Sequence, residues 1–209
     1  MTVTDVNVVK SAIFERPDDA NKGTLGSLLC VCGSYGMAGA AVMSAKGALR
    51  TGIGLAKCAL PRSIYPIVAQ TILESVYYPL SENADGRISK VNVPFLVSES
   101  CKSSATLVGC GLGVCDDTLK IVFSFIENST TPLVLDADAL NCVAKQPEIL
   151  LRKKAPIIIT PHPGEMSRLT GLATPLVNAE RERVALDFAQ KYGVVTVLKG
   201  AGTVIASPN

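Results

Sequence analysis

The feature that most constrains the fold of this chain is the alternation of short apolar runs with longer segments of helical spacing. The runs are rich in β-branched residues, and several are apolar nearly throughout, as expected for strands that are covered on both faces. They cover residues 28–31, 55–60, 105–108, 133–135, 157–160 and 194–198. Strands and helices in repeated alternation predict an α/β fold with a mostly parallel central sheet and helices on both sides.

Two of the intervening segments, residues 39–50 and 181–192, have the spacing of apolar residues that is typical of helices. Gly52 and Gly193 follow them, and a glycine just past the last turn commonly ends a helix. Right-handed crossovers place the loops that follow parallel strands along one edge of the sheet, where such sheets bind ligands. We find no internal repeat and no linker, so we expect residues 1–209 to form a single domain.

The composition excludes several classes of function. Hydrophobic residues make up 48% of the 209 residues and charged residues only 18%, which indicates a well-buried globular protein. Lys and Arg number 20 against 18 Asp and Glu without marked clustering, so nothing favours nucleic acid as a partner. No apolar run approaches the length of a membrane span, and residues 1–5 do not resemble a signal peptide. We expect no membrane partner.

The seven cysteines are odd in number and show no C-x-x-C spacing. Several of them fall within apolar strand-like runs, where a free cysteine behaves as a small hydrophobic residue. With a single histidine in the chain, a zinc site is not expected either. We therefore expect a reduced, cytoplasmic protein, and we assign no residue as a metal ligand.

Residues 160–166 follow an apolar run and contain that histidine, His162, between two prolines. Each proline fixes φ near −65° and restricts the residue before it, so the histidine is held in a stiff backbone. Rigid placement suits a side chain that must meet a ligand, and we interpret this segment as part of a binding site. The alternative is a strand-to-helix turn with an incidental histidine.

Two glycine-rich segments also follow predicted strands. Residues 33–41 place three glycines before an Ala-rich helix start, and residues 109–113 carry a glycine at every second position. Glycines let a ligand approach the backbone closely, and the free N–H groups of a helix start favour polar or anionic ligands. Tight packing of the first helix on the sheet explains the first segment about equally well, and a flexible turn explains the second.

Asp136 and Asp138 lie two positions apart directly after another predicted strand. In an extended segment the two carboxylates share a face, which suits a hydrated magnesium ion or a substrate hydroxyl. The alternative is that one of them, Asp138 in particular, caps the helix that begins near Ala139. Asp136 is therefore the better functional candidate.

Residues 199–203, Lys-Gly-Ala-Gly-Thr, join two β-rich runs at 194–198 and 204–206. The spacing predicts two strands joined by a tight glycine turn. A lysine, two glycines and a threonine hydroxyl also suit the phosphate or ribose of a nucleotide, so this segment is a candidate for both roles.

Together and in this order, these motifs resemble the ADP/ATP-dependent NAD(P)H-hydrate dehydratase family, the carbohydrate kinase-like domain of the ribokinase superfamily. The resemblance runs from about Lys22 to the end of the chain. Its most specific parts are residues 22–26, 39–41, 136–140, 160–166 and 198–200 with Thr203. The resemblance implies a ribokinase-like three-layer α/β/α sandwich.

The resemblance also implies the chemistry. A hydroxyl on the reduced nicotinamide ring is phosphorylated by ADP or ATP with Mg²⁺ as a further cofactor, and the loss of phosphate restores NAD(P)H. In that family, the residues that match Ala40, Gly111 and His162 bind the hydrated substrate. The residues that match Lys199, Gly200, Ala201, Gly202 and Thr203 bind the nucleotide. Relatives also imply a homo-oligomer, a tetramer in some of them.

The chain departs from the family pattern at three points. Asn21 stands where members usually have histidine, and Cys110 stands where they commonly have proline. The 209 residues also contain no Gly-x-Gly-Asp motif, whose glycines bind the transferred phosphate and whose aspartate is the expected general base. We therefore identify no catalytic residue, place the expected aspartate beyond Asn209, and expect a C-terminally incomplete fold in a fragment of a longer gene product.

Two other functions remain open. The same fold supports kinases for small alcohols such as vitamin precursors, although the histidine turn and the Asp136 segment argue against that function. The chain is alternatively a non-catalytic subunit that holds an adenine nucleotide or a nicotinamide cofactor.

Overall fold

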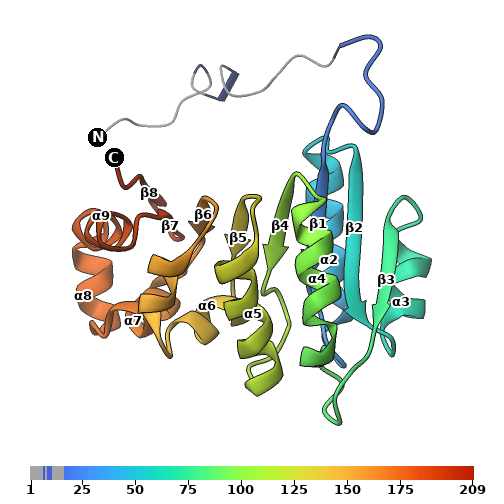
Figure 1. Cartoon of the computed structure of the whole chain (residues 1–209). Coiled ribbons are helices and arrows are strands. Elements are labelled where there is room, and N and C mark those ends of the chain that lie inside the picture. Colours follow the sequence, from blue (N-terminus) through green and yellow to red (C-terminus); the bar gives the residue numbers. More distant parts are fainter. Residues whose placement is uncertain (1–6, 8, 11–16) are drawn as a thin grey trace.

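The computed structural model describes residues 7, 9, 10 and 17–209, so the expectation about a signal peptide at residues 1–5 lies outside the described residues. In the described part, one eight-stranded sheet has the order β3-β2-β1-β4-β5-β6-β7-β8 (Figure 1). The strands are β1 (Ser27–Val31), β2 (Leu55–Pro61), β3 (Val76–Leu80), β4 (Ala105–Val108), β5 (Leu133–Leu135), β6 (Ile157–Ile159), β7 (Val195–Leu198) and β8 (Val204–Ala206). Every neighbouring pair is parallel except β7 with β8, which confirms the predicted mostly parallel α/β sheet.

Helices connect the strands. The α-helices are α2 (Ala38–Arg50), α3 (Tyr65–Thr71), α4 (Val93–Cys101), α5 (Asp116–Asn128), α6 (Asp138–Val143), α7 (Pro163–Thr170), α8 (Thr174–Ala179) and α9 (Arg181–Tyr192). Two short 3₁₀ helices, η1 (Lys90–Asn92) and η2 (Pro147–Arg152), precede α4 and β6. Gly193 caps α9 in the left-handed conformation, and Gly52 has φ +97° just past the cap of α2, as the sequence predicted.

The predicted strands are all present, and β3 is an addition that the sequence analysis did not predict. It contains Pro79, which cannot donate a hydrogen bond to a neighbouring strand. Because β3 is an edge strand that pairs with β2 only, one of its sides needs no partner, and the proline is tolerated there. The predicted hairpin between β7 and β8 is confirmed by the antiparallel pairing of Leu198 with Val204.

The direction of winding reverses between β1 and β4. The chain moves from β1 through β2 to β3, then returns to the other side of β1 and continues from β4 to β7. Right-handed crossovers therefore place α2 and α3 on one face and the later helices on the other. Figure 1 shows α4 and α5 in front of the strands and α2 behind β1. A parallel sheet binds ligands at this kind of switch point, outside the carboxyl ends of the two strands.

The residues of β1 alternate between two apolar clusters. Leu29 and Val31 are fully buried in the larger cluster with the later helices. Cys30 and Cys32 belong to the smaller cluster, which includes Ala41 of α2. The small side chains at this second interface let α2 pack close to the sheet, so its first turn lies next to the end of β1.

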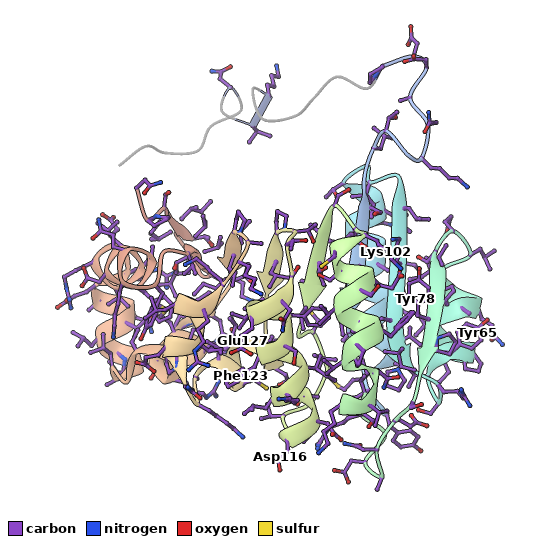
Figure 2. The ribbon with its side chains drawn as sticks, in the orientation of Figure 1. Tyr65, Tyr78, Lys102, Asp116, Phe123 and Glu127 are labelled. Atoms are coloured by element: carbon purple, nitrogen blue, oxygen red, sulfur yellow. The ribbon has the colours of Figure 1, made fainter. Side chains whose placement is uncertain are left out.

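The loops after β3 and β4 lie at the lower edge of the sheet in Figure 1. Two of the residues labelled in Figure 2 lie near opposite edges of the sheet: Asp116, the first residue of α5, at the lower edge, and Lys102, just after α4, near the upper edge. Within the described residues, no helix is both long enough and apolar enough to cross a bilayer.

Candidate functional site

The loops that follow β1 and β4 are hydrogen-bonded to each other at the switch point. Gly33 N–H donates to Cys110 O at 2.8 Å, and the buried Ser34 Oγ donates to Gly111 O at 2.8 Å. Gly111 has φ +68°, and a Cβ at this position would lie 2.7 Å from the Cβ of Ala40. The structure therefore brings together Ala40 and Gly111, two of the predicted substrate-binding residues, and only glycine fits at position 111.

The first turn of α2 lies next to this switch point and consists of small residues, alanines and a glycine. Its N-cap, Met37, makes no side-chain hydrogen bond to the helix, and the first turn contains no acidic residue. The N–H groups of a helix start that lack a capping side chain are available to a polar or anionic ligand. Beside them the Tyr35 ring is 74% exposed, and Tyr35 N–H donates to Gly86 O at 2.9 Å.

The loop after β5 has a strained backbone. Ala137 has φ +50° and ψ −116°, and it is the one non-glycine residue with positive φ among those described. The backbone of Asp136 closely approaches Gly109, where a Cβ would collide with the Asp136 carbonyl oxygen. The expectation of an extended segment was therefore wrong, and Asp136 and Asp138 do not share a face as they would on a strand.

Asp138 binds the neighbouring loop and does not cap α6. The N-cap of that helix is Ala137, which makes no side-chain hydrogen bond to it. Asp138 Oδ2 instead accepts from Gly113 N–H at 2.8 Å, and Asp138 Oδ1 accepts from Asn141 Nδ2 at 3.4 Å. The capping interpretation of Asp138 was wrong because the turn at Ala137 points the carboxylate toward the loop after β4.

Asp136 connects the loop after β5 to the hairpin that follows β7. Its Oδ1 lies 2.7 Å from Lys199 Nζ and also accepts from Ala137 N–H at 2.8 Å. The Cys110 Sγ lies 3.8 Å from Asp136 Oδ2. The carboxylate is therefore committed to an ion pair and is not a free base.

His162 is the N-cap of α7. Its Nδ1 accepts hydrogen bonds from Gly164 N–H at 3.0 Å and Glu165 N–H at 3.3 Å, and Glu165 Oε2 accepts from His162 N–H at 2.9 Å. This reciprocal arrangement is a capping box, with Pro163 as the first helical residue. Because the Nδ1 lone pair is occupied, we assign the proton of the neutral ring to Nε2, which lies 3.3 Å from Glu165 Oε1.

The role of the histidine as a cap adds to the binding interpretation without replacing it. The side chain is 51% exposed, so the ring offers a face and an edge to a ligand while both nitrogens hold the helix start. Glu165 is only 5% exposed and fixes the ring from the protein side. The ring is therefore placed for contact and not for proton transfer.

The hairpin at residues 199–203 is joined to the His162 loop. Lys199 N–H donates to Pro161 O at 2.8 Å, so the two post-strand segments are direct neighbours. Within the turn, Gly200 N–H donates to Thr203 Oγ1 at 3.2 Å, and the hydroxyl donates back to Gly200 O at 3.0 Å. Both predicted ligand sides therefore lie on the same edge of the sheet.

Arg181, at the start of α9, binds the backbone of the hairpin with its side chain. Its Nη2 donates to Leu198 O at 2.9 Å and to Lys199 O at 3.0 Å, and its Nε donates to Gly202 O at 3.3 Å. One guanidinium thus satisfies three backbone carbonyls of the turn. Sequence reasoning missed this residue because an arginine at a helix start has no periodic or motif signal.

Sequence reasoning also missed Arg87, in the loop after β3. Its side chain packs against Gly113, where a Cβ would collide with the Arg87 guanidinium nitrogen Nε. Its carboxylate partner, Asp85, is 67% exposed at the side chain, and Nη1 of Arg87 lies 3.2 Å from it. This adds a cation next to the glycine loop after β4.

The described residues do not form a protein-held metal centre. No group of three or more His, Cys, Asp or Glu among them is arranged to bind a metal ion. Asp136 is paired with Lys199, and Asp138 is bound by the backbone and an amide. The carboxylates that the sequence suggested for a hydrated magnesium ion therefore bind other groups of the protein in the described structure.

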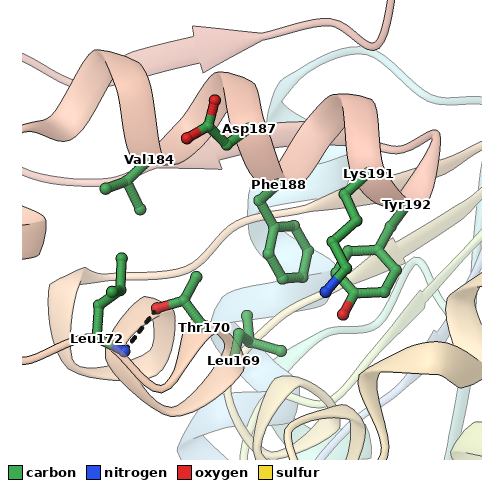
Figure 3. A pocket seen from close by; sticks show the side chains of 8 residues that line it. All are labelled: Leu169, Thr170, Leu172, Val184, Asp187, Phe188, Lys191 and Tyr192. Carbon is green, nitrogen blue, oxygen red and sulfur yellow. Dashed lines mark hydrogen bonds between the residues drawn. The ribbon is translucent and has the colours of Figure 1, made fainter.

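A separate cavity of about 200 Å³ lies between α7 and α9, away from the predicted site (Figure 3). It is lined by Leu169, Thr170, Leu172, Val184, Asp187, Phe188, Lys191 and Tyr192. In Figure 3 the two leucines and the two aromatic rings face its interior, and Lys191 Nζ lies 4.9 Å from the centre of the Tyr192 ring. None of the predicted ligand-binding residues lines this cavity.

The five loops that follow β1, β4, β5, β6 and β7 form one connected series. Backbone or side-chain hydrogen bonds join the first to the second, the second to the third through Gly113 and Asp138, and the fourth to the fifth. The Lys199–Asp136 pair joins the third to the fifth. One end of the series presents glycines and a helix start, and the other presents an ammonium group. This arrangement suits two ligands, one on the glycine side and one on the lysine side.

Comparison with known proteins shows the family to which the chain is similar. The model of the family described as NAD(P)H-hydrate dehydratase matches residues 28–209. The bifunctional NAD(P)H-hydrate repair enzyme of Thermofilum pendens is 39% identical over 194 residues, which are 93% of this chain and 37% of that protein. The ADP-dependent (S)-NAD(P)H-hydrate dehydratase of Neisseria meningitidis is 32% identical over 93% of this chain and 62% of its own length.

Solved structures show the same likeness. The crystal structure of the ADP/ATP-dependent NAD(P)H-hydrate dehydratase of Bacillus subtilis, co-crystallized with ATP/Mg²⁺, superposes with a TM-score of 0.78 at 30% identity. The match covers 97% of this chain and 68% of that one. A ribokinase-like superfamily protein of Enterococcus faecalis, 20% identical with a TM-score of 0.77, shows the shared fold. The chain spans somewhat more than a third of the bifunctional relative from Thermofilum pendens.

Proposed function

This chain belongs to the NAD(P)H-hydrate dehydratase family, and from that premise we propose that it serves in the nucleotide-dependent dehydration of hydrated NAD(P)H back to NAD(P)H. This is a metabolite-repair reaction of the lyase class. The observation that carries the proposal is the hydrogen bond from Lys199 N–H to Pro161 O, because it makes the lysine hairpin and the histidine loop neighbours. Two ligands that must react need such neighbouring sites.

The chemistry follows from the properties of the leaving group. A hydroxyl on the reduced nicotinamide ring leaves poorly, whereas a phosphate leaves readily with its electron pair. Transfer of a phosphoryl group from ADP or ATP to the hydroxyl, followed by loss of phosphate and of a ring proton, restores the ring double bond. Positioning and the neutralisation of phosphate charge supply most of the catalysis in phosphoryl transfer.

We place the hydrated nicotinamide substrate against Ala40, Gly111 and His162. The contact between the first two and the positive φ of Gly111 support a flat surface on which a ring can lie. The histidine offers the face of its half-exposed ring, since both of its nitrogens serve the start of α7. The exposed Tyr35 ring and Arg87 border the same loops and suit the charged remainder of a dinucleotide.

We place the adenine nucleotide against the hairpin residues Lys199, Gly200, Ala201, Gly202 and Thr203. The ammonium group at the mouth of the hairpin and the glycine backbone support phosphate binding. Arg181 holds the carbonyl groups of the turn, which keeps them from facing the phosphates. We assign no general base among the described residues, because Asp136 is ion-paired and Glu165 is buried against His162.

Three further properties are part of the proposal. Mg²⁺ accompanies the nucleotide and is held by its phosphates and water, as is common where the protein supplies few ligands. The chain works as one domain in a homo-oligomer, on the ground of the resemblance. The seven cysteines are all free in the structure, which supports a reducing compartment, the cytoplasm.

The test measures recovery of NADPH from its hydrate with ADP, with ATP and without nucleotide, on this chain and on a version extended through the downstream reading frame. Recovery that requires a nucleotide supports the proposal. Phosphorylation of a vitamin precursor without NADPH recovery would instead identify a small-molecule kinase. Nucleotide binding without turnover in either form would identify a binding subunit.

A further inference from the structure

Cys110 occupies an unusual position between the two proposed ligand sides. It lies between Gly109 at φ +130° and Gly111 at φ +68°, in the loop after β4, and its side chain is partly exposed. Its Sγ lies 3.8 Å from Oδ2 of Asp136, whose other oxygen binds Lys199. Cys110 is therefore a partly exposed residue at the centre of the site.

Cys32 lies next to it. The parallel register that pairs Val31 with Val108 continues into the loops, where Gly33 N–H donates to Cys110 O at 2.8 Å. Because Gly33 follows Cys32 directly, this hydrogen bond makes Cys32 and Cys110 neighbours across the two loops. Gly109 at φ +130° interrupts the extended geometry before Cys110, so the strand alternation does not fix the face on which the Cys110 side chain lies. A disulfide requires segments that lie as close together as these two.

The side chains of the two cysteines meet at the same apolar cluster. Cys32 is buried in the small apolar cluster under α2, and Cys110 packs against the same cluster. Cys30 and Cys58 belong to the same cluster and are paired in register on β1 and β2. Cys110 is the one partly exposed member of the four, so it is the member that a reagent from solvent reaches first.

We propose that Cys110 is a site of oxidative modification and that Cys32 closes a disulfide with it when a hydroperoxide is the oxidant. In the first step, the Cys110 thiolate attacks one oxygen of the hydroperoxide, the O–O bond breaks, and Cys110 becomes a sulfenic acid. The other oxygen leaves as hydroxide or alkoxide and is protonated to water or an alcohol. In the second step, the Cys32 sulfur attacks Sγ of Cys110, the S–OH bond breaks, and the hydroxyl group leaves as water with the proton of the Cys32 thiol. The two thiols lose two electrons, and the hydroperoxide gains them.

The electrostatics of the pair favour this order of events. The neighbouring Cys32 thiol lowers the pKa of Cys110 to about 7, helped by Ser44 and the Lys199 ammonium and opposed by burial and the Asp136 carboxylate. The Cys110 sulfur, together with burial, raises the pKa of Cys32. Cys110 is therefore the attacking thiolate near neutral pH, and Cys32 is the resolving thiol.

A disulfide at this position alters the substrate side of the site. Gly111 follows Cys110 directly and already contacts Ala40 closely, so a new bond to Cys32 displaces the loop or the helix start. We expect the oxidised form to lose NADPH-hydrate turnover, a consequence that rests on the proposed function. The covalent chemistry at Cys110 does not rest on it.

The experiment treats the reduced chain with hydrogen peroxide and maps the products by mass spectrometry after digestion. We expect a peptide in which Cys32 and Cys110 are linked, and its loss on treatment with dithiothreitol. In Cys32→Ser we expect Cys110 to stop at the sulfenic acid, trapped by dimedone. In Cys110→Ser we expect no disulfide that involves Cys32. We expect the same result in Cys110→Ala, which has no side-chain oxygen.

Cys101→Ser is the matched control, because Cys101 is exposed and lies at the end of α4, outside the cluster. This variant should form the link as the unmodified chain does. Oxidation confined to Cys101 or Cys115, with Cys110 still reduced, would overturn the proposal. Turnover is measured on the extended version described above. Linkage without loss of turnover in that version would overturn the regulatory consequence, whereas absence of turnover in its reduced form would count against the proposed function alone.

Discussion

Lys199 and Asp136 form an ion pair that joins the hairpin after β7 to the loop after β5, with Lys199 Nζ 2.7 Å from Asp136 Oδ1. The two side chains are 41% and 24% exposed, so solvent screens much of their attraction. The pair therefore contributes little to stability, and its main effect is to hold the ammonium group at the mouth of the hairpin.

Lys199→Ala should weaken ATP binding about tenfold or more, because a charge-assisted contact to phosphate is lost. The free energy of unfolding should change by less than about 1 kcal/mol, as expected for a partly exposed pair. Titration calorimetry with ATP and urea denaturation measure the two quantities. Asp136→Asn, which leaves the ammonium group in place, should weaken ATP binding less, and equal losses in both variants would contradict this role of Lys199.

His162→Ala should lower the free energy of unfolding by about 1 kcal/mol, since α7 loses its N-cap. His162→Asn restores an acceptor at the cap and should recover most of that stability. Both variants remove the imidazole ring, so both should weaken binding of hydrated NADPH while leaving ATP affinity near normal. If His162→Asn recovers substrate binding together with stability, the ring has only a structural role.

Arg181→Ala should loosen the hairpin, because three carbonyl groups of the turn lose their donor. We expect about a tenfold loss of ATP affinity, which corresponds to roughly 1.4 kcal/mol. Arg183→Ala is the matched control on the same helix, since Arg183 is exposed and binds only Glu180 and Asp187 among the described residues. Equal ATP affinities in the two variants would show that Arg181 does not position the hairpin.

Ala137→Gly should stabilise the protein by about 1 kcal/mol, because glycine adopts φ +50° without the strain that a Cβ imposes. Ala144→Gly is the comparison, since Ala144 caps α6 with φ −61° and gains nothing from the extra freedom. That variant should be destabilised by about 0.5–1 kcal/mol. Urea midpoints that shift in the same direction for both would argue against strain at Ala137.

Alkylation of Cys110 by iodoacetamide should accelerate as pH rises toward its pKa of about 7 and then level off. The thiolate is the nucleophile, so below this pKa each unit of pH lowers the rate about tenfold. Cys32→Ala removes the neighbouring thiol that lowers this pKa and should shift the profile to higher pH. Peptide mapping separates the reaction at Cys110 from that at Cys101, and an unshifted profile would show that Cys32 does not tune Cys110.

Most strands of the sheet could be predicted from local patterns in the sequence. Uninterrupted apolar runs identified β1, β2 and β4 to β7, because strands buried on both faces leave no polar alternation. β3 escaped prediction because Pro79 is a poor strand residue except at an edge, and only the assembled sheet shows which strand is at the edge.

The candidate site, too, was predictable in part from the sequence and in part only from the assembled structure. Parallel connectivity was enough to place His162 and Lys199 on one edge, because every right-handed crossover returns the chain in the same direction. The turn at Ala137 and the interactions of Asp138 were not predictable, since they depend on how closely the loop after β5 approaches Gly109 and Gly113.

By itself, the sequence determined the alternation of strands and helices, the glycine turns and the family resemblance, because these depend on residues that are close together along the chain. Only the tertiary structure decided the partners of individual side chains: Arg181 with the carbonyl groups of the hairpin, Asp138 with Gly113, and Cys110 beside Cys32. These contacts join segments that are distant in sequence. Their outcome depends on packing in three dimensions, which no local pattern encodes.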